Sequence, residues 1–254
     1  MVEKTPILDF FTYFFLLAGI IIVGFPIIYA ILASTLTLEE VSQVPMPLIF
    51  GDQFFVNISA AWSRGDLGTQ LMNSFIMATG ITIGKIVVSM FGAFSMVYFD
   101  YRFRVVAFVS VFCTLMLPVE VRILPTYEMA ANVFGPLQPV WDFLQLDSLL
   151  SWITQNDVEV LLNWNLLDSY TGLILPLIAS ATCTFLFRQF FLTIPEELCE
   201  AAKIDGASPM VFFRKVLFPL SKTNIAALVV IEFVYGWNQY LWPLLITTDP
   251  KMKT

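Results

Sequence analysis

Apolar runs of about 20 residues alternate with shorter polar stretches along most of this chain. A helical run of that length crosses the hydrocarbon core of a bilayer. Five runs qualify, at roughly 10–33, 71–98, 105–127, 170–192 and 222–246. Because backbone groups in lipid must be satisfied within each span, the runs are expected to be helices. The pattern predicts an all-α, polytopic helical membrane protein, with residues 1–254 forming a single transmembrane domain.

Composition strengthens this interpretation and excludes several chemistries. The 254 residues are 58% hydrophobic and only 13% charged, whereas soluble domains are about 25% charged. The net charge of −7 argues against nucleic-acid partners. The chain has no histidine, so His-based metal sites and Ser-His or Cys-His nucleophiles are excluded, and no cofactor or metal is expected. The three cysteines, Cys113, Cys183 and Cys199, are expected to be small buried hydrophobes.

The distribution of Lys and Arg predicts the orientation of the spans, because basic residues concentrate in short cytoplasmic loops. With the N-terminus in the cytoplasm, three basic residues lie in outer loops, Arg64, Lys251 and Lys253. Eight lie inside: Lys4, Arg102, Arg104, Arg188, Lys203, Arg214, Lys215 and Lys222. The outer stretch 134–165, punctuated by Trp141, Trp152 and Trp164, predicts one or two helices at the outer interface or, equally, a loop packed on that face.

The polar segment 193–220, between the fourth and fifth runs, carries strong helix-end signals. Thr193 and Glu196 have the spacing of a capping box, with Pro195 in the first turn. Gly206 is expected to end this helix. Pro209 at the first position then starts a second helix that ends near Pro219. The segment therefore predicts a helix–turn–helix on the cytoplasmic side, either docking a partner or packing on its own membrane domain.

Several motifs carry a resemblance to a known family. Glu200, Ala201, Ala202, Gly206 and Pro219 match the positions of the EAA loop of ABC-transporter importer permeases, the segment that docks onto the ATP-hydrolysing subunit; Val216 also matches, and Phe218 replaces the usual Leu. The chain resembles the carbohydrate-type members over nearly its whole length, notably in 114–122, 185–191 and 236–243. Within that family it looks most similar to permeases for sn-glycerol-3-phosphate.

The resemblance implies a type I importer permease fold in the bacterial inner membrane. It implies a second permease subunit, two ATP-binding subunits at the cytoplasmic loop and a periplasmic substrate-binding protein as partners, with lipid around the spans. Asp205 joins the ATPase-coupling residues on this basis. Such a permease continues into a sixth span, so the expectation is that this sequence lacks its C-terminal end. The stretch 134–165 is an insertion relative to the family pattern.

Ionisable residues inside the apolar runs are candidates for the substrate path, because a charge in lipid is costly. Arg122 is the first choice for anion contact, since its planar fork suits phosphate; an internal ion pair with Glu120, Glu128 or Glu232 is the alternative. Lys85 and Glu232 are expected either to pair or to line a water-filled path. Glu120 and Asn238 are further candidates for the substrate path.

The expected function is therefore the permease subunit of an ATP-driven importer, without catalytic residues of its own. The chain contains no Gly-x-x-x-x-Gly-Lys-Ser/Thr motif, so ATP hydrolysis belongs to a partner. One alternative is an importer permease for another sugar or polyol. The other is a polytopic membrane enzyme that uses Asp100, Glu120 and Glu232 as acids, although these residues show no paired spacing.

Overall fold

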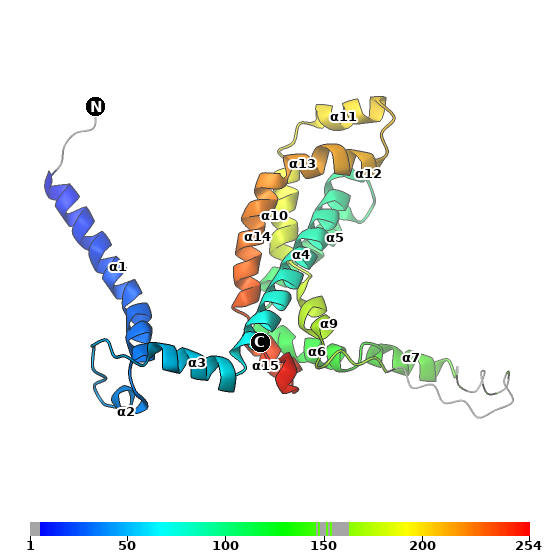
Figure 1. Cartoon of the computed structure of the whole chain (residues 1–254). Helices are drawn as coiled ribbons and strands as arrows, with labels where there is room; N and C mark the ends of the chain where they lie inside the picture. The colour runs from blue at the N-terminus through cyan, green and yellow to red at the C-terminus, as the bar shows by residue number, and fades with distance from the viewer. Residues whose placement is uncertain (1–5, 146, 148–150, 152, 154–162) are drawn as a thin grey trace. The chain divides into compact units, whose positions relative to one another are not determined.

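The computed structural model describes residues 6–145, 147, 151, 153 and 163–254. These residues form helices joined by short loops, with no strand among them (Figure 1). The all-α prediction is confirmed. The chain divides into two compact units, Met1–Gly68 and Thr69–Thr254.

The first unit is dominated by one long apolar helix, α1 (Pro6–Thr35). The short helix α2 (Leu38–Val41) and helix α3 (Phe54–Arg64) follow it. The Asn57 side-chain amide donates to the carbonyl oxygens of Ser34 and Leu36, both at 2.9 Å, and this ties α3 to the end of α1. Most of the α1 surface is exposed and apolar, as expected for a helix solvated by lipid.

The second unit is built around α4 (Leu67–Tyr98), which packs with α10 (Ala181–Phe191) and α14 (Lys222–Trp237). Two apolar clusters hold it together. One, the α4–α10 cluster, lies near α11 (Glu196–Ile204) and includes Phe94, Phe187 and Phe213. The ring of Phe213 also stacks on that of Phe91, with centroids 4.8 Å apart. The other cluster lies near α15 (Leu241–Ile246) and includes Met77, Leu173 and Trp242. Between the two clusters lie the buried charges of α4 and α14.

Small residues set the closeness of this packing. The sequence places Gly80 and Gly84 four apart on α4, a spacing that favours helix contact. A β-carbon on Gly80 would collide with the Ile174 side chain, and one on Gly84 with the Ile178 side chain. The predicted face of α4 is therefore a packing face. The residues before α10 pack closely against it.

Three segments expected as continuous spans are interrupted. The run 105–127 divides into α5 (Arg104–Cys113), a 3-10 turn (Thr114–Met116) and α6 (Val119–Ala131). The run 170–192 divides into α9 (Tyr170–Ile174), a 3-10 turn (Leu175–Leu177) and α10, which bend by 49°. The run 222–246 divides into α14 and α15 (Leu241–Ile246).

Proline explains part of this pattern. Pro118 caps the start of α6, and the residue before a proline is disfavoured in helical conformation. Of the described helices, α1 and α4 alone are long and apolar enough to cross a membrane unaided; two bent pairs, 170–177 with 181–191 and 209–220 with 222–237, would raise the number to four. Interrupted helices place helix ends, and their polar backbone groups, inside the bundle.

The stretch 134–165 is described only in part. It begins with a 3-10 turn (Gly135–Leu137) and α7 (Gln138–Phe143), and the Trp141 indole donates to Asp147 at 2.9 Å. Trp164 packs against Phe134 with ring centroids 5.9 Å apart. Trp152 lies outside the described residues, as do the neighbouring leucine pairs. The location of this stretch at a membrane interface stays a prediction.

Candidate functional site

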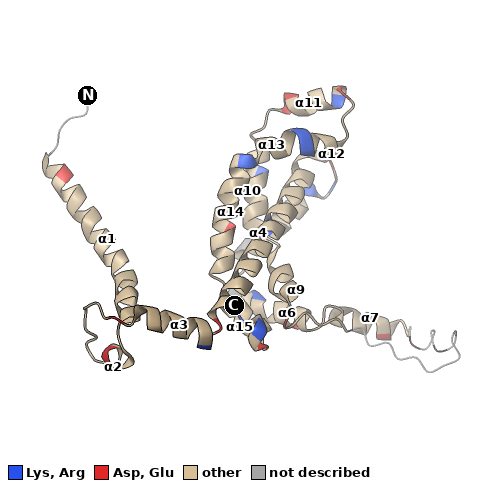
Figure 2. Ribbon diagram, in the orientation of Figure 1, with Lys and Arg blue, Asp and Glu red and all other residues tan. Residues whose placement is uncertain are grey.

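The polar loop 193–220 forms two helices beyond the end of the bundle (Figure 1). Helix α11 (Glu196–Ile204) is followed by a turn and by α12 (Pro209–Phe212). Helix α12 continues through a π-helical turn (Phe213–Leu217) into α13 (Phe218–Leu220), and α14 starts one residue later. Figure 2 shows Lys and Arg gathered where α11, α12 and α13 meet.

Gly206 makes the turn between α11 and α12. Its φ of +68° lies in the left-handed region that glycine adopts without a steric penalty. The Gly206 N–H donates to Lys203 O at 3.0 Å, and the Ala207 N–H donates to Ala202 O at 2.9 Å. These two bonds form a Schellman motif, which satisfies the last carbonyl groups of α11. The expected role of Gly206 as a helix terminator is confirmed.

One detail of the predicted loop is wrong. Helix α11 is capped by Pro195 rather than Thr193, whose hydroxyl donates to Phe190 O at 2.7 Å. Ile194 precedes a proline, which disfavours the helical conformation that a capping box requires of it. The second helix ends at Leu220, close to Pro219 as expected. The wide π-helical turn just before Pro219 accommodates its ring and its missing N–H.

The two faces of α11 differ. Cys199 and Ala202 pack inward against the α4–α10 cluster. Glu200 and Ala201 are exposed, as are Asp205, Gly206 and Pro219. Ile204 is 86% exposed at the end of the same helix.

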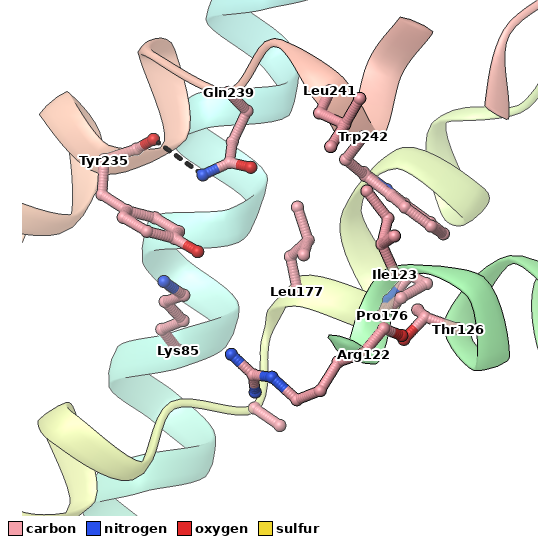
Figure 3. Close-up of a pocket in the computed structure, with 11 residues that line it drawn as sticks. Lys85, Arg122, Ile123, Thr126, Pro176, Leu177, Tyr235, Gln239, Leu241 and Trp242 are labelled. Atoms are coloured by element: carbon pink, nitrogen blue, oxygen red, sulfur yellow. Dashed lines mark hydrogen bonds between the residues drawn. The ribbon is translucent and has the colours of Figure 1, made fainter. Parts of the chain in front are cut away.

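A second candidate site lies inside the bundle. Two adjoining cavities of about 110 and 580 Å³ share four lining residues: Lys85, Arg122, Ala179 and Tyr235. Gln239 also lines the smaller cavity and donates to the Tyr235 carbonyl at 3.3 Å (Figure 3). Asn238, the residue predicted from the sequence, is absent from the lining of both. The four shared residues come from α4, α6, the break before α10 and α14, respectively.

Lys85 and Glu232 form a buried ion pair on the wall of the larger cavity. The Lys85 Nζ lies 2.7 Å from Glu232 Oε2, and the two side chains are 7% and 6% exposed. The same Nζ lies 3.5 Å from the centroid of the Tyr235 ring. The Cys183 thiol donates to the other carboxylate oxygen, Oε1, at 2.7 Å. Both oxygens of Glu232 are therefore engaged, as a buried carboxylate requires.

Arg122 faces the same space from α6 (Figure 3). It is exposed, and among the side chains that the structure describes it has no ion-pair partner within 4.0 Å. Glu232, one of its predicted partners, is held by Lys85, while Glu120 has a side chain outside the described set. Asp100 pairs with Arg104 at 3.4 Å and Glu232 with Lys85 at 2.7 Å, so these two acids of the enzyme alternative do not share a site.

The start of α10 adds partial positive charge to the cavity. Ser180, Ala181 and Thr182 line the larger cavity, and the Ser180 hydroxyl accepts from the Cys183 N–H at 3.2 Å as an N-cap. Backbone N–H groups in a first helical turn carry the positive end of the helix dipole. Sequence reasoning missed this feature, because it treated 170–192 as one continuous helix. It also missed Tyr235, although that residue lies three positions after Glu232.

Comparison with known proteins decides the family. Residues 85–254, which include α10–α14 and every residue of both sites, match the family described as binding-protein-dependent transport system inner membrane component. This chain belongs to that family. The permease is 48% identical over 260 residues to the sn-glycerol-3-phosphate transport system permease protein UgpE of Yersinia pestis bv. Antiqua (strain Antiqua), with 100% of this chain and 82% of that protein covered.

Other relatives agree with this assignment. The same permease protein of Escherichia coli O1:K1 / APEC is 49% identical over 261 residues, again covering 100% of this chain and 82% of that protein. The fold resembles a crystal structure of a bacterial ABC transporter involved in the import of the acidic polysaccharide alginate, with a TM-score of 0.74 and 18% identity, covering 99% of this chain and 79% of that one. The predicted importer permease fold is confirmed.

Proposed function

We propose that this permease forms part of the path for sn-glycerol-3-phosphate in an ATP-driven importer. The observation that carries the proposal is the 48% identity, over the whole chain, to permeases named for that substrate. The cavity supports it on independent chemical grounds. Of its charged lining residues, Lys85 and Arg122 are basic and Glu232 is acidic, so the lining has a net charge of 2 − 1 = +1.

A phosphate monoester suits this lining better than a neutral sugar does. Arg122 has donors in a planar fork, which binds two phosphate oxygens at once. The first turn of α10 contributes further donors on the same cavity wall. Gln239 and the Tyr235 ring offer a hydrogen-bonding group and an apolar surface for the glycerol part. Glycerol itself would leave the guanidinium without an anion.

The loop 193–220 is the proposed docking site for ATP-binding subunits. Its exposed residues Glu200, Ala201 and Ile204 lie on one short helix, and the loop joins α14 through a single residue, Ser221. A displacement of α11 and α12 by the ATPase would therefore move α14, which carries Glu232. A second permease would complete the path, and a periplasmic binding protein would deliver the substrate.

The proposed orientation places the N-terminus and the loop 193–220 in the cytoplasm of a bacterial cell. The Lys and Arg that gather around α11–α13 favour this side (Figure 2). A reporter that is active only in the periplasm should be active when inserted after Asp52 and inactive after Gly206. The reverse pattern would overturn the orientation without affecting the family assignment.

The test of the substrate is uptake by the complete importer. The permease, expressed with its partners in cells that lack other routes for the compound, should accumulate labelled sn-glycerol-3-phosphate and should not accumulate labelled glycerol. Uptake of a neutral sugar or polyol at a higher rate than sn-glycerol-3-phosphate would contradict the proposal and favour the alternative substrate class.

A further inference from the structure

We infer that Lys85 is a second phosphate-binding residue, which exchanges its partner Glu232 for the substrate phosphate when the cavity is occupied. This inference rests on the proposed function. It assigns a specificity role to the buried ion pair, and it explains why a paired lysine forms part of the cavity wall at all.

The position of Lys85 supports the exchange. Its side chain lines both cavities, although it is only 7% exposed. Figure 3 shows the Arg122 guanidinium directed from α6 toward the Lys85 side chain on α4, while the Lys85 ammonium group lies beside the Tyr235 ring. Both side chains line both cavities, so an anion bound to Arg122 there would lie in a space that Lys85 also lines. The ammonium group has three donors, so it can reach a phosphate oxygen by a small rotation about its flexible stem.

The surroundings of Glu232 make the exchange tolerable. A buried charge that simply loses its partner is strongly destabilising. Here the Cys183 thiol already donates to Glu232 Oε1, so the carboxylate keeps one hydrogen bond when Lys85 turns away. The carboxylate also lines the larger cavity, where water can reach it. The centroid of the Tyr235 ring lies 3.5 Å from Lys85 Nζ, a contact that favours the charge of the ammonium group.

Through this exchange the importer would recognise its substrate by the phosphate group. A neutral polyol has no charge with which to compete against Glu232, so the pair would stay closed around it. Glu232 lies on α14, which follows the docking loop with one intervening residue. Release of Glu232 from α4 therefore removes a link between α4 and the helix that the loop moves. Phosphate binding would free α14 to follow the ATPase.

A reversal of the pair separates this role from a structural one. In Lys85→Glu/Glu232→Lys the ion pair is kept and its direction is reversed, so a purely structural pair is restored. If Lys85 binds phosphate, the reversed pair places a carboxylate where the phosphate must bind. Uptake of sn-glycerol-3-phosphate per assembled importer should then fall by at least about tenfold, the equivalent of one charge-assisted hydrogen bond. The exposed pair Asp100–Arg104 is the control. An importer in which this pair is reversed in the same way should keep its uptake of sn-glycerol-3-phosphate.

The wild-type importer separates the two proposals. If it fails to take up sn-glycerol-3-phosphate, the proposed function is wrong. If it does, and the reversed pair transports equally well per assembled importer, the role of Lys85 is wrong while the function stands. A second variant, Lys85→Met/Glu232→Met, covers the case in which the reversed pair does not assemble, because apolar residues often replace a buried ion pair without loss of stability. That variant should assemble and lose uptake by about tenfold or more; undiminished uptake would overturn the inference.

Discussion

The docking loop 193–220 and the central cavity are built in opposite ways. The loop is short and contiguous, its key residues are exposed, and one glycine turn defines its shape. The cavity is assembled from residues as far apart in the sequence as Lys85 and Trp242, and the charges of its Lys85–Glu232 pair are almost fully buried. In the proposed function the loop offers a surface to the ATP-binding subunits, whereas the cavity accepts the charged part of the substrate.

This difference separates the expected effects of mutation. A change in the loop should alter communication with the ATPase and leave the cavity intact. A change in the cavity should alter which compound is carried and leave docking intact. Two helices link the two regions. Helix α14 begins at the loop and carries Glu232 toward the cavity, and α10 begins at the cavity and ends at the loop. Variants that affect one region and spare the other therefore test the account.

The largest effect is expected at Gly206, where a graded series is available. Proline cannot adopt the φ of +68°, so Gly206→Pro should abolish substrate-stimulated ATPase activity of the assembled importer. A left-handed conformation costs most other residues roughly 1–2 kcal/mol, and Asn tolerates it best. Gly206→Asn should therefore be mild and Gly206→Ala intermediate. Normal stimulated ATPase activity in the proline variant would contradict a coupling role for this loop.

A smaller effect is expected from Arg122→Lys, which keeps the charge and removes the planar fork. Uptake of sn-glycerol-3-phosphate per assembled importer should fall by about tenfold, while copurification of the ATPase stays unchanged. Uptake should fall further in Arg122→Leu. If the arginine has only a structural role, lysine should serve nearly as well; unchanged uptake in Arg122→Lys would move the anion site elsewhere.

The exposed face of α11 should respond to added bulk more weakly. Ala201→Trp fills no space within the permease, because Ala201 is exposed, but it would obstruct close approach of a partner. The amount of ATPase that copurifies should fall severalfold, with permease abundance unchanged. The neighbouring Ala202→Trp is the matched comparison, since Ala202 packs against the α4–α10 cluster and its variant should lower permease abundance instead. Equal abundance and equal copurification in both would contradict the assignment of the two faces.

The smallest effect is expected at Asp168, which joins the start of α9 to the end of α15. Its carboxylate accepts from the Thr248 hydroxyl at 2.6 Å and from the Asp249 N–H at 2.8 Å. The Thr248 hydroxyl and the two backbone N–H groups hold the pKa of Asp168 below its usual value. A lowered pKa gives stability that is present at neutral pH and is lost as the pH falls through that lowered value.

Asp168→Asn should therefore reduce the melting temperature slightly at neutral pH. The difference from the wild type should shrink below about pH 4, the ordinary range of aspartate, as the wild-type carboxylate becomes protonated. Thermal unfolding in detergent at several pH values measures this, with Asp9→Asn as a control for loss of a negative charge. A difference that stays constant down to the lowest pH would contradict the proposed contribution of the carboxylate.

The loop could be predicted from sequence because its signals are local. Gly206, Pro209 and the residues between them fix the turn through their own backbone preferences. The failure at Thr193 is also local, since the effect of Pro195 on Ile194 outweighs the capping spacing. The predicted loop was therefore correct in its architecture and wrong by two residues at its first helix start.

The cavity could be predicted only in part. Lys85, Arg122 and Glu232 stood out because charges are rare in apolar runs. Their arrangement in space could not be predicted. Hydrophobicity cannot show that the run 170–192 breaks at Ser180 and directs a helix start into the bundle. The expected pairing of Lys85 with Glu232 is confirmed, but hydrophobicity cannot decide between Lys85, 147 positions away, and Arg122 as the partner of Glu232. Such pairings depend on packing between helices, for which one sequence carries no local signal.

The most direct test is a structure of the complete importer, trapped by an ATP analogue with sn-glycerol-3-phosphate in its membrane path. The account predicts phosphate density in contact with Arg122 and with the Lys85 ammonium group, and Glu232 separated from Lys85 while still bonded to Cys183. Phosphate density away from Arg122, with the Lys85–Glu232 pair intact, would contradict it.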